Sequence, residues 1–104
     1  MGRQVTVLFR EGWQAACAEL GRELPWVTRR ANLLVEGVAV PGKGQRLFIG
    51  AAELEVTGET EPCSVMEAAS RGLRAALKPE WRGGVTCNVV QGGAIKVGDN
   101  VKAK

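Results

Sequence analysis

Short stretches in which apolar and polar residues alternate, separated by glycines, are the feature that most restricts the fold of this chain. A side-chain period of two is typical of β-strands with one buried face. Six or seven such stretches fit into the sequence, with two or three helix-like stretches between them. Because the stretches follow one another mostly through tight turns, we expect a mostly β fold with inserted helices: a small antiparallel β-barrel or curled sheet. A length of 104 residues fits one domain, residues 1–104, with one core.

The pattern assigns individual strands and two hairpins. The expected strands cover residues 4–9, 32–36, 46–49, 53–57, 85–90 and 94–97. Gly50 and Ala51 are expected to turn the chain in a first hairpin. Gly92 and Gly93 predict a second hairpin that leads into the strand at 94–97.

Two amphipathic helices are expected between the strands. The first covers residues 11–20 and ends at Gly21; its buried residues recur at helical spacing, namely Trp13, Ala16, Cys17 and Leu20. The second begins at Ser64, which together with Glu67 has the spacing of a capping box, and it ends at Pro79. Its expected buried residues are Met66, Ala69, Leu73 and Leu77.

Composition excludes several classes of function. The net charge is only +3 and aromatic residues are few, so we expect no nucleic-acid partner. No apolar stretch is long enough to cross a membrane, so no membrane partner is expected either. The chain has no histidine, which removes Cys–His and Ser–His–Asp catalysis. Its three cysteines are widely spaced and odd in number, which favours free thiols in a reducing cytoplasm over disulfides.

Cys63 is the cysteine with a chemical context. It directly precedes the helix expected at Ser64, and unpaired N–H groups at a helix start favour a thiolate, the form that binds soft metals or accepts sulfur. Nearby Glu59 and Glu61 would oppose ionisation. The alternative is a partly buried structural cysteine. Cys17 and Cys87 lie on apolar faces and are expected in the core.

A pair of arginines precedes the strand at 32–36. Arg29, Arg30 and Asn32 could together hold a phosphate or carboxylate, because guanidinium groups bind such anions through paired hydrogen bonds. The alternative is a solvated charged turn. An anionic small molecule suits these local clusters of positive charge better than a polymer does.

Four stretches, taken together, resemble the MOSC domain, the C-terminal domain type of molybdenum cofactor sulfurases. They are RQVTVL, TRRANLLVEGV, IGAAELEVTGETEPCSVMEAA and GGVTCNVVQGGAIKVGDNV, in the order of the chain. The most specific parts are Arg-x-Asn at 30–32, Thr-Gly-x-x-x-Pro-Cys at 57–63 and Gly-Gly-x-Ile-x-Val-Gly-Asp at 92–99. The resemblance implies a β-barrel similar to the barrel domain of pyruvate kinase, and binding of the molybdenum cofactor (molybdopterin).

The resemblance also implies roles for single residues. Cys63 matches the family cysteine that ligates molybdenum or carries sulfur. Arg30 and Asn32, with Arg29 beside them, match the residues near the pterin and its phosphate. Thr57 and Gly58 match the strand end that shapes the site.

Three functions follow as alternatives. The first is a cofactor-binding or sulfur-carrying domain, which would act with a sulfurase, a molybdoenzyme or an electron-donor protein. The second is a molybdenum-dependent reductase of N-hydroxylated compounds, and the third is a non-catalytic structural or interaction barrel. Family members usually carry further strands before the counterpart of RQVTVL, so we also expect an incomplete barrel whose exposed edge favours a homodimer.

Overall fold

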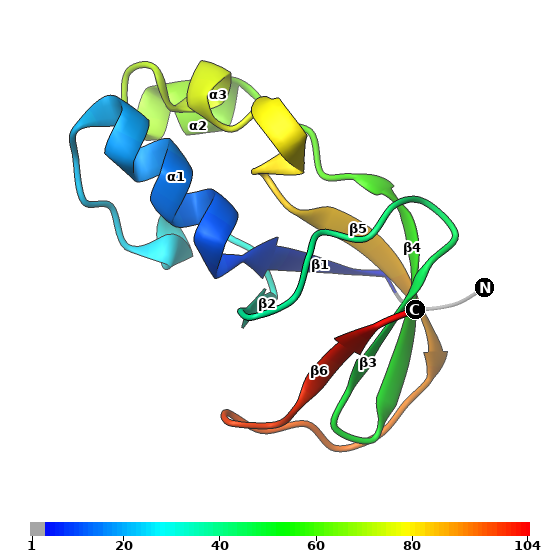
Figure 1. The fold of residues 1–104 in the computed structure, drawn as a ribbon. Coiled ribbons are helices and arrows are strands. Elements are labelled where there is room, and N and C mark those ends of the chain that lie inside the picture. The colour runs from blue at the N-terminus through cyan, green and yellow to red at the C-terminus, as the bar shows by residue number, and fades with distance from the viewer. Residues whose placement is uncertain (1–3) are drawn as a thin grey trace.

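Six strands form one curved sheet in the computed structural model of the chain, which describes residues 4–104 (Figure 1). The strands are β1 (Gln4–Phe9), β2 (Leu33–Val35), β3 (Arg46–Ile49), β4 (Ala52–Glu59), β5 (Val85–Gln91) and β6 (Val101–Ala103). Their order in the sheet is β2-β1-β5-β4-β3-β6. The edge strands β2 and β6 direct Leu33 and Val101 into the same core, so the sheet forms a nearly closed barrel and the expected fold class is confirmed.

The helices cover one side of this barrel and bury a second cluster. They are α1 (Arg10–Leu20), α2 (Ser64–Ala69) and α3 (Leu73–Ala76), with two 3-10 turns, η1 (Trp26–Arg29) and η2 (Pro79–Trp81). Alternation along β1 separates the two cores: Val7 and Phe9 point into the barrel, whereas Leu8 points outward beneath the helices. The outer face of the sheet is therefore apolar under the helix layer and polar beyond it.

Several expected elements are confirmed at or near their predicted bounds. Strand β1 covers residues 4–9 as predicted. Helix α1 starts one residue early and ends at Gly21, whose φ of 67° is the left-handed conformation that glycine adopts most readily. Strands β3 and β4 pair through the expected turn at Gly50 and Ala51, and β4 extends two residues beyond the prediction. Cys17 and Cys87 are buried as expected.

The expected second helix is corrected in three respects. It is interrupted after Ala69 and resumes at Leu73, because Gly72 takes a φ of 88° between α2 and α3. No side-chain cap is present at the start of α2, so the capping box is wrong. Glu67 instead accepts hydrogen bonds from the backbone N–H groups of Gly72 (3.0 Å) and Arg74 (3.4 Å). Ala69 is exposed rather than buried.

The sheet topology also differs from the expectation in two places. Strands β1 and β2 pair in parallel and are joined through α1, so the sheet is mixed rather than wholly antiparallel. The predicted hairpin at Gly92 and Gly93 is wrong: residues 92–97 form no strand, and β6 pairs with β3 instead. Gly93 packs against Ala51 so closely that an added Cβ would lie 2.7 Å from the Ala51 carbonyl oxygen.

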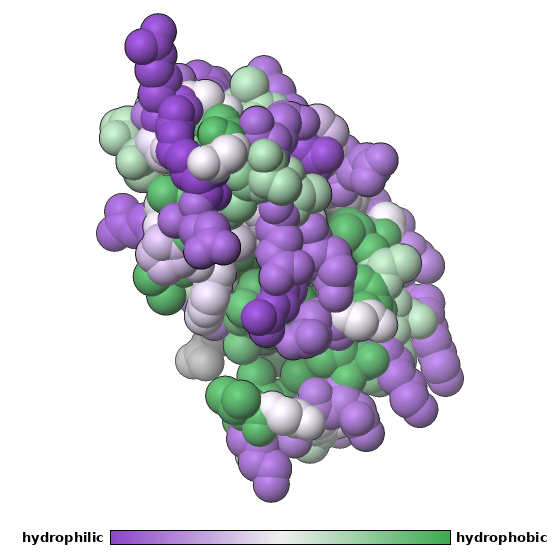
Figure 2. Space-filling view, turned by 60° about the vertical axis from the view of Figure 1, so that its left-hand side comes forward, coloured by the Kyte–Doolittle hydropathy of each residue, from purple (hydrophilic) through white to green (hydrophobic). Residues whose placement is uncertain are grey.

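The barrel is open at the seam between its edge strands. A cavity of about 400 Å³ opens at one end of the barrel, with Val5 of β1, Leu33 of β2 and Leu54 of β4 among the apolar residues of its wall. In Figure 2 the hydrophobic surface is most continuous in the lower half of the face, at the height of the strands. Within residues 4–104, no helix has the length and apolar character needed to cross a membrane.

Candidate functional site

A row of polar residues crosses four strands on the outer face of the sheet. Strand pairing places Thr6 of β1 opposite Thr86 of β5, and Thr86 opposite Gly58 of β4. Asn32, at the start of β2, joins the other end of the row: its side-chain oxygen accepts hydrogen bonds from the Thr6 backbone N–H (2.8 Å) and hydroxyl (3.1 Å). The row Asn32–Thr6–Thr86–Gly58 therefore brings two predicted site residues onto one surface.

A bulge in β4 shapes the Gly58 end of this row. The register between β4 and β5 shifts between Val56 and Gly58, so Thr57 is an extra residue, and its hydroxyl donates to the Thr86 carbonyl at 2.9 Å. The Thr60 and Thr86 hydroxyls lie 3.1 Å apart. A Cβ on Gly58 would meet no heavy atom within 4 Å, so the space above this position is open. Thr57 therefore holds the Thr86 end of the row in place, and Gly58 leaves open space above the row.

Arg29 lies beneath the site rather than on it. Only 8% of its surface is exposed, and its guanidinium donates to the carbonyls of Gly83 (2.9 Å) and Thr60 (2.8 Å). Burial lowers the pKa of the Arg29 guanidinium, and negative charge at Cys63 and Glu59 opposes that shift. Arg29 is thus a buried cation that holds the Thr60 carbonyl, and the Thr60 hydroxyl joins it to the row.

Cys63 is exposed at the residue before α2. Its backbone carbonyl accepts the Met66 N–H (2.9 Å), which fixes the start of the helix. Because α2 has only six residues, its dipole is weak. The thiol is accessible to a ligand, in contrast to the buried thiols of Cys17 and Cys87.

Arg30 differs from Arg29 in exposure, in backbone conformation and in side-chain contacts. It is exposed, it ends η1 in the left-handed region with a φ of 64°, and its side chain makes no hydrogen bond or ion pair within residues 4–104. A non-glycine residue in this conformation costs roughly 1 kcal/mol. The cost is consistent with a guanidinium that is held out, two residues before Asn32, for a partner outside the chain.

Sequence reasoning missed the residues that connect the predicted ones. Thr6 and Thr86 lie on strands and Thr60 directly follows one, and only the pairing of β1, β5 and β4 brings these three threonines together. Alternation would have placed Thr6 and Thr86 on the outer faces of their strands, but not beside one another. No group of three or more His, Cys, Asp or Glu side chains could hold a metal within the described part of the chain.

Comparisons with known proteins agree with the fold. The MOSC domain family matches residues 1–102. The crystal structure of the YuaD protein of Bacillus subtilis is similar over 98% of this chain, with a TM-score of 0.78 and 22% identity. That of YiiM from Geobacillus stearothermophilus is similar over 99%, with a TM-score of 0.81 and 20% identity. The chain spans 64% and 58% of the lengths of these two proteins. No curated protein sequence gives a match.

Proposed function

The chain belongs to the MOSC domain family, and from this premise we propose that its outer polar face binds the molybdenum cofactor. In this proposal the Cys63 thiolate would hold the molybdenum as a ligand. Alternatively it would take sulfane sulfur from the persulfide of a sulfurase partner, whose thiolate is the leaving group. Arg30 pairs with the phosphate, and Asn32 with the pterin. The observation that carries the proposal is the polar row from Asn32 to Gly58, which has open space over Gly58 and in which Thr86 contacts Thr60, three residues before the exposed Cys63 thiol.

The residues present fit such a group in charge, softness and space. A thiolate is a soft ligand and suits a metal already bound to sulfur. The guanidinium of Arg30 is exposed and makes no bond to residues 4–104, so it can pair with phosphate in two parallel hydrogen bonds. The open space over Gly58 leaves room for a planar ring system between the two ends.

The chain's own residues would bind and orient, while the bound cofactor would supply the redox and sulfur chemistry. Asn32 has its oxygen occupied by Thr6, so only its NH₂ group is left to contact a ligand. Arg29 is almost fully buried and holds the Thr60 and Gly83 carbonyls in place. We propose a cofactor-binding or sulfur-carrying domain that acts with a partner protein.

Cofactor binding to four proteins tests this function. We expect wild-type protein to retain both molybdenum and pterin after ultrafiltration with cofactor released from a molybdoenzyme. Arg30→Met should weaken pterin retention about 10- to 100-fold, the equivalent of one charge-assisted hydrogen bond. Cys63→Ala should lose molybdenum and keep more of the pterin than Arg30→Met does.

Arg71→Met is the matched control, because Arg71 is an exposed arginine between α2 and α3. It should bind like the wild type. Equal retention of molybdenum by wild type and Cys63→Ala, or no retention by either, contradicts the proposed function.

A further inference from the structure

The cavity of about 400 Å³ at the end of the barrel, the barrel mouth, has an uncharged wall. Its wall is mainly apolar, and it includes side chains that also pack in the barrel core, such as Val5, Leu33 and Val89. Among the described residues that line it, only Gln4 and Asn32 have polar side chains, and both are neutral. Small-molecule sites have volumes of about 300–1,000 Å³ and mostly apolar walls with a few polar groups that orient the ligand. The barrel mouth has these properties.

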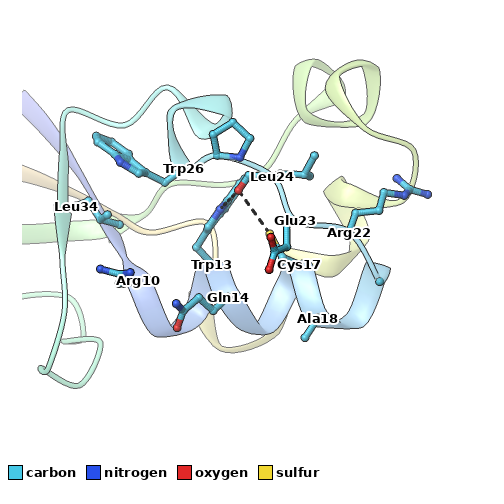
Figure 3. A pocket seen from close by; sticks show the side chains of 12 residues that line it. Arg10, Trp13, Gln14, Cys17, Ala18, Arg22, Glu23, Leu24, Trp26 and Leu34 are labelled. Atoms are coloured by element: carbon cyan, nitrogen blue, oxygen red, sulfur yellow. Dashed lines mark hydrogen bonds between the residues drawn. The ribbon is translucent and has the colours of Figure 1, made fainter.

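A larger cavity of about 770 Å³, the α1 cavity, has a different character (Figure 3). It lies between α1 and the residues that follow this helix, and Arg10, Arg22 and Glu23 are among the residues that line it. One of its walls is held by Trp13, whose Nε1–H donates to the Leu24 carbonyl at 2.9 Å. Because moving an ion from water into apolar surroundings is costly, the barrel mouth favours a neutral ligand, whereas the α1 cavity does not.

Gly92 leaves open space at the barrel mouth although the fold does not require glycine there. Its φ lies outside the left-handed region, and an added Cβ would meet no heavy atom of the described chain within 4 Å. The next residue differs, because an added Cβ on Gly93 would lie 2.7 Å from the Ala51 carbonyl oxygen. Packing therefore requires the glycine at Gly93, while a side chain at Gly92 would only take up space beside the cavity that this residue lines.

Asn32 supplies a hydrogen-bond donor at the same cavity. Its side-chain oxygen accepts two hydrogen bonds from Thr6, which fixes the orientation of the amide. Its NH₂ group makes no hydrogen bond within residues 4–104 and carries two hydrogens, so it can serve the cofactor site and the barrel mouth at once. The group that matches this donor on a neutral ligand is a carbonyl oxygen.

We propose that the barrel mouth binds a small neutral carbonyl compound with an apolar ring. The ring occupies the space beside Gly92 between the apolar walls, and the carbonyl oxygen accepts a hydrogen bond from the Asn32 NH₂ group. A rigid ring suits the site because it loses little conformational freedom on binding. If the proposed function holds, this ligand lies beside the Asn32 end of the bound cofactor, but its own binding requires no cofactor.

Titration of the full chain with benzamide, followed by NMR, tests the proposal. We expect saturable shifts of the backbone amide signals of Val5, Leu33 and Val89 in the millimolar range of benzamide. Benzamidine has almost the same shape but carries a positive charge and no carbonyl, so it should bind at least about tenfold more weakly. The indole N–H signal of Trp13 should not shift, because Trp13 lines the α1 cavity.

Two variants remove the features on which binding depends. Gly92→Leu should fill the barrel mouth and weaken benzamide binding by about tenfold or more. Gly42→Leu is the matched control, because Gly42 also has an ordinary φ and room for a Cβ but does not line the cavity, so it should bind like the wild type. Asn32→Asp keeps an oxygen for Thr6 and removes the donor, which should weaken binding about tenfold.

Spectra of the free proteins show whether each variant folds, and Asn32→Asp decides the test if Gly92→Leu does not. The proposal is overturned if wild type shows no saturable shifts, if benzamidine binds as tightly as benzamide, or if a folded variant of either kind binds like the wild type. Shifts of the same amides with protein concentration alone would mean that a second copy occupies the mouth, which also overturns it. Since no cofactor is used, failure here is distinguishable from failure of cofactor binding.

Discussion

Two adjacent arginines show how a single residue step decides between structure and function. Arg29 ends η1 with its side chain under the sheet, whereas Arg30 takes the left-handed conformation that directs it into solvent. Both residues are arginines in the same turn, so the local sequence cannot predict which of the two is buried and which is exposed. The difference comes from the Thr60 and Gly83 carbonyls, which lie 31 and 54 residues further along the chain from Arg29.

Methionine substitutions at these neighbours should have opposite consequences. Arg29→Met leaves the Gly83 and Thr60 carbonyls without a donor in a buried place, which should lower the free energy of unfolding by about 1–3 kcal/mol. Arg30→Met removes only an exposed side chain and should change it by less than about 0.5 kcal/mol. Urea unfolding, followed by tryptophan fluorescence, measures the free energy of unfolding of both variants. A loss of stability in Arg30→Met as large as that in Arg29→Met would show that the two residues share a structural role.

Secondary structure elements are predictable here where short-range contacts decide them, and not elsewhere. Alternation and helical spacing were sufficient for β1, for α1 and for the hairpin of β3 and β4, because each is stabilised by a face that the local pattern defines. Two predictions failed because contacts outside the local pattern decide the structure: the uninterrupted helix after Cys63 and the strand after β5. Glu67 bonds across the break to Gly72, and Gly93 packs on Ala51, contacts that spacing cannot reveal.

Glu67 and Ser64 provide a test at the level of the element. Glu67 accepts backbone N–H groups at the start of α3, so Glu67→Ala should lower the free energy of unfolding by about 0.5–1 kcal/mol. Ser64 makes no capping bond, so Ser64→Ala should have almost no effect. Thermal unfolding of the two variants measures the difference. Equal losses of unfolding free energy in Glu67→Ala and Ser64→Ala would instead indicate that Ser64 caps the start of α2.

The candidate site exists only at the scale of the whole molecule. Cys63, Arg30 and Asn32 were proposed from the sequence, but the polar row that ends at Asn32 depends on the pairing of β1, β5 and β4. Asn32 and Thr6 are 26 residues apart, and the parallel pairing that unites them follows from the path of the chain through α1 rather than from any motif. The sequence therefore predicts candidate groups, while the polar row beside Asn32 required the fold.

Cys87 offers a test of the barrel core as a whole. It is fully buried in β5, and burial raises the pKa of its thiol from 9.0 to about 11. In the unfolded chain the thiol ionises near its ordinary value, so between these two pKa values the native state holds a proton that the unfolded state has lost. The free energy of unfolding should therefore be unaffected by Cys87 below pH 9 and should fall as the pH rises, by about 1.4 kcal/mol per unit, until the native thiol also ionises.

The comparison of wild type with Cys87→Ala isolates this effect, since the two proteins differ in no other ionisable group. Urea unfolding under reducing conditions at about pH 8 and about pH 11 should show that the wild type loses roughly 2 kcal/mol more than the variant. At about pH 8 the variant should be less stable than the wild type, because it lacks the buried sulfur. The difference between their free energies of unfolding should become smaller as the pH rises. A constant gap across this range would mean that the barrel opens around Cys87 and hydrates its thiol before the chain unfolds.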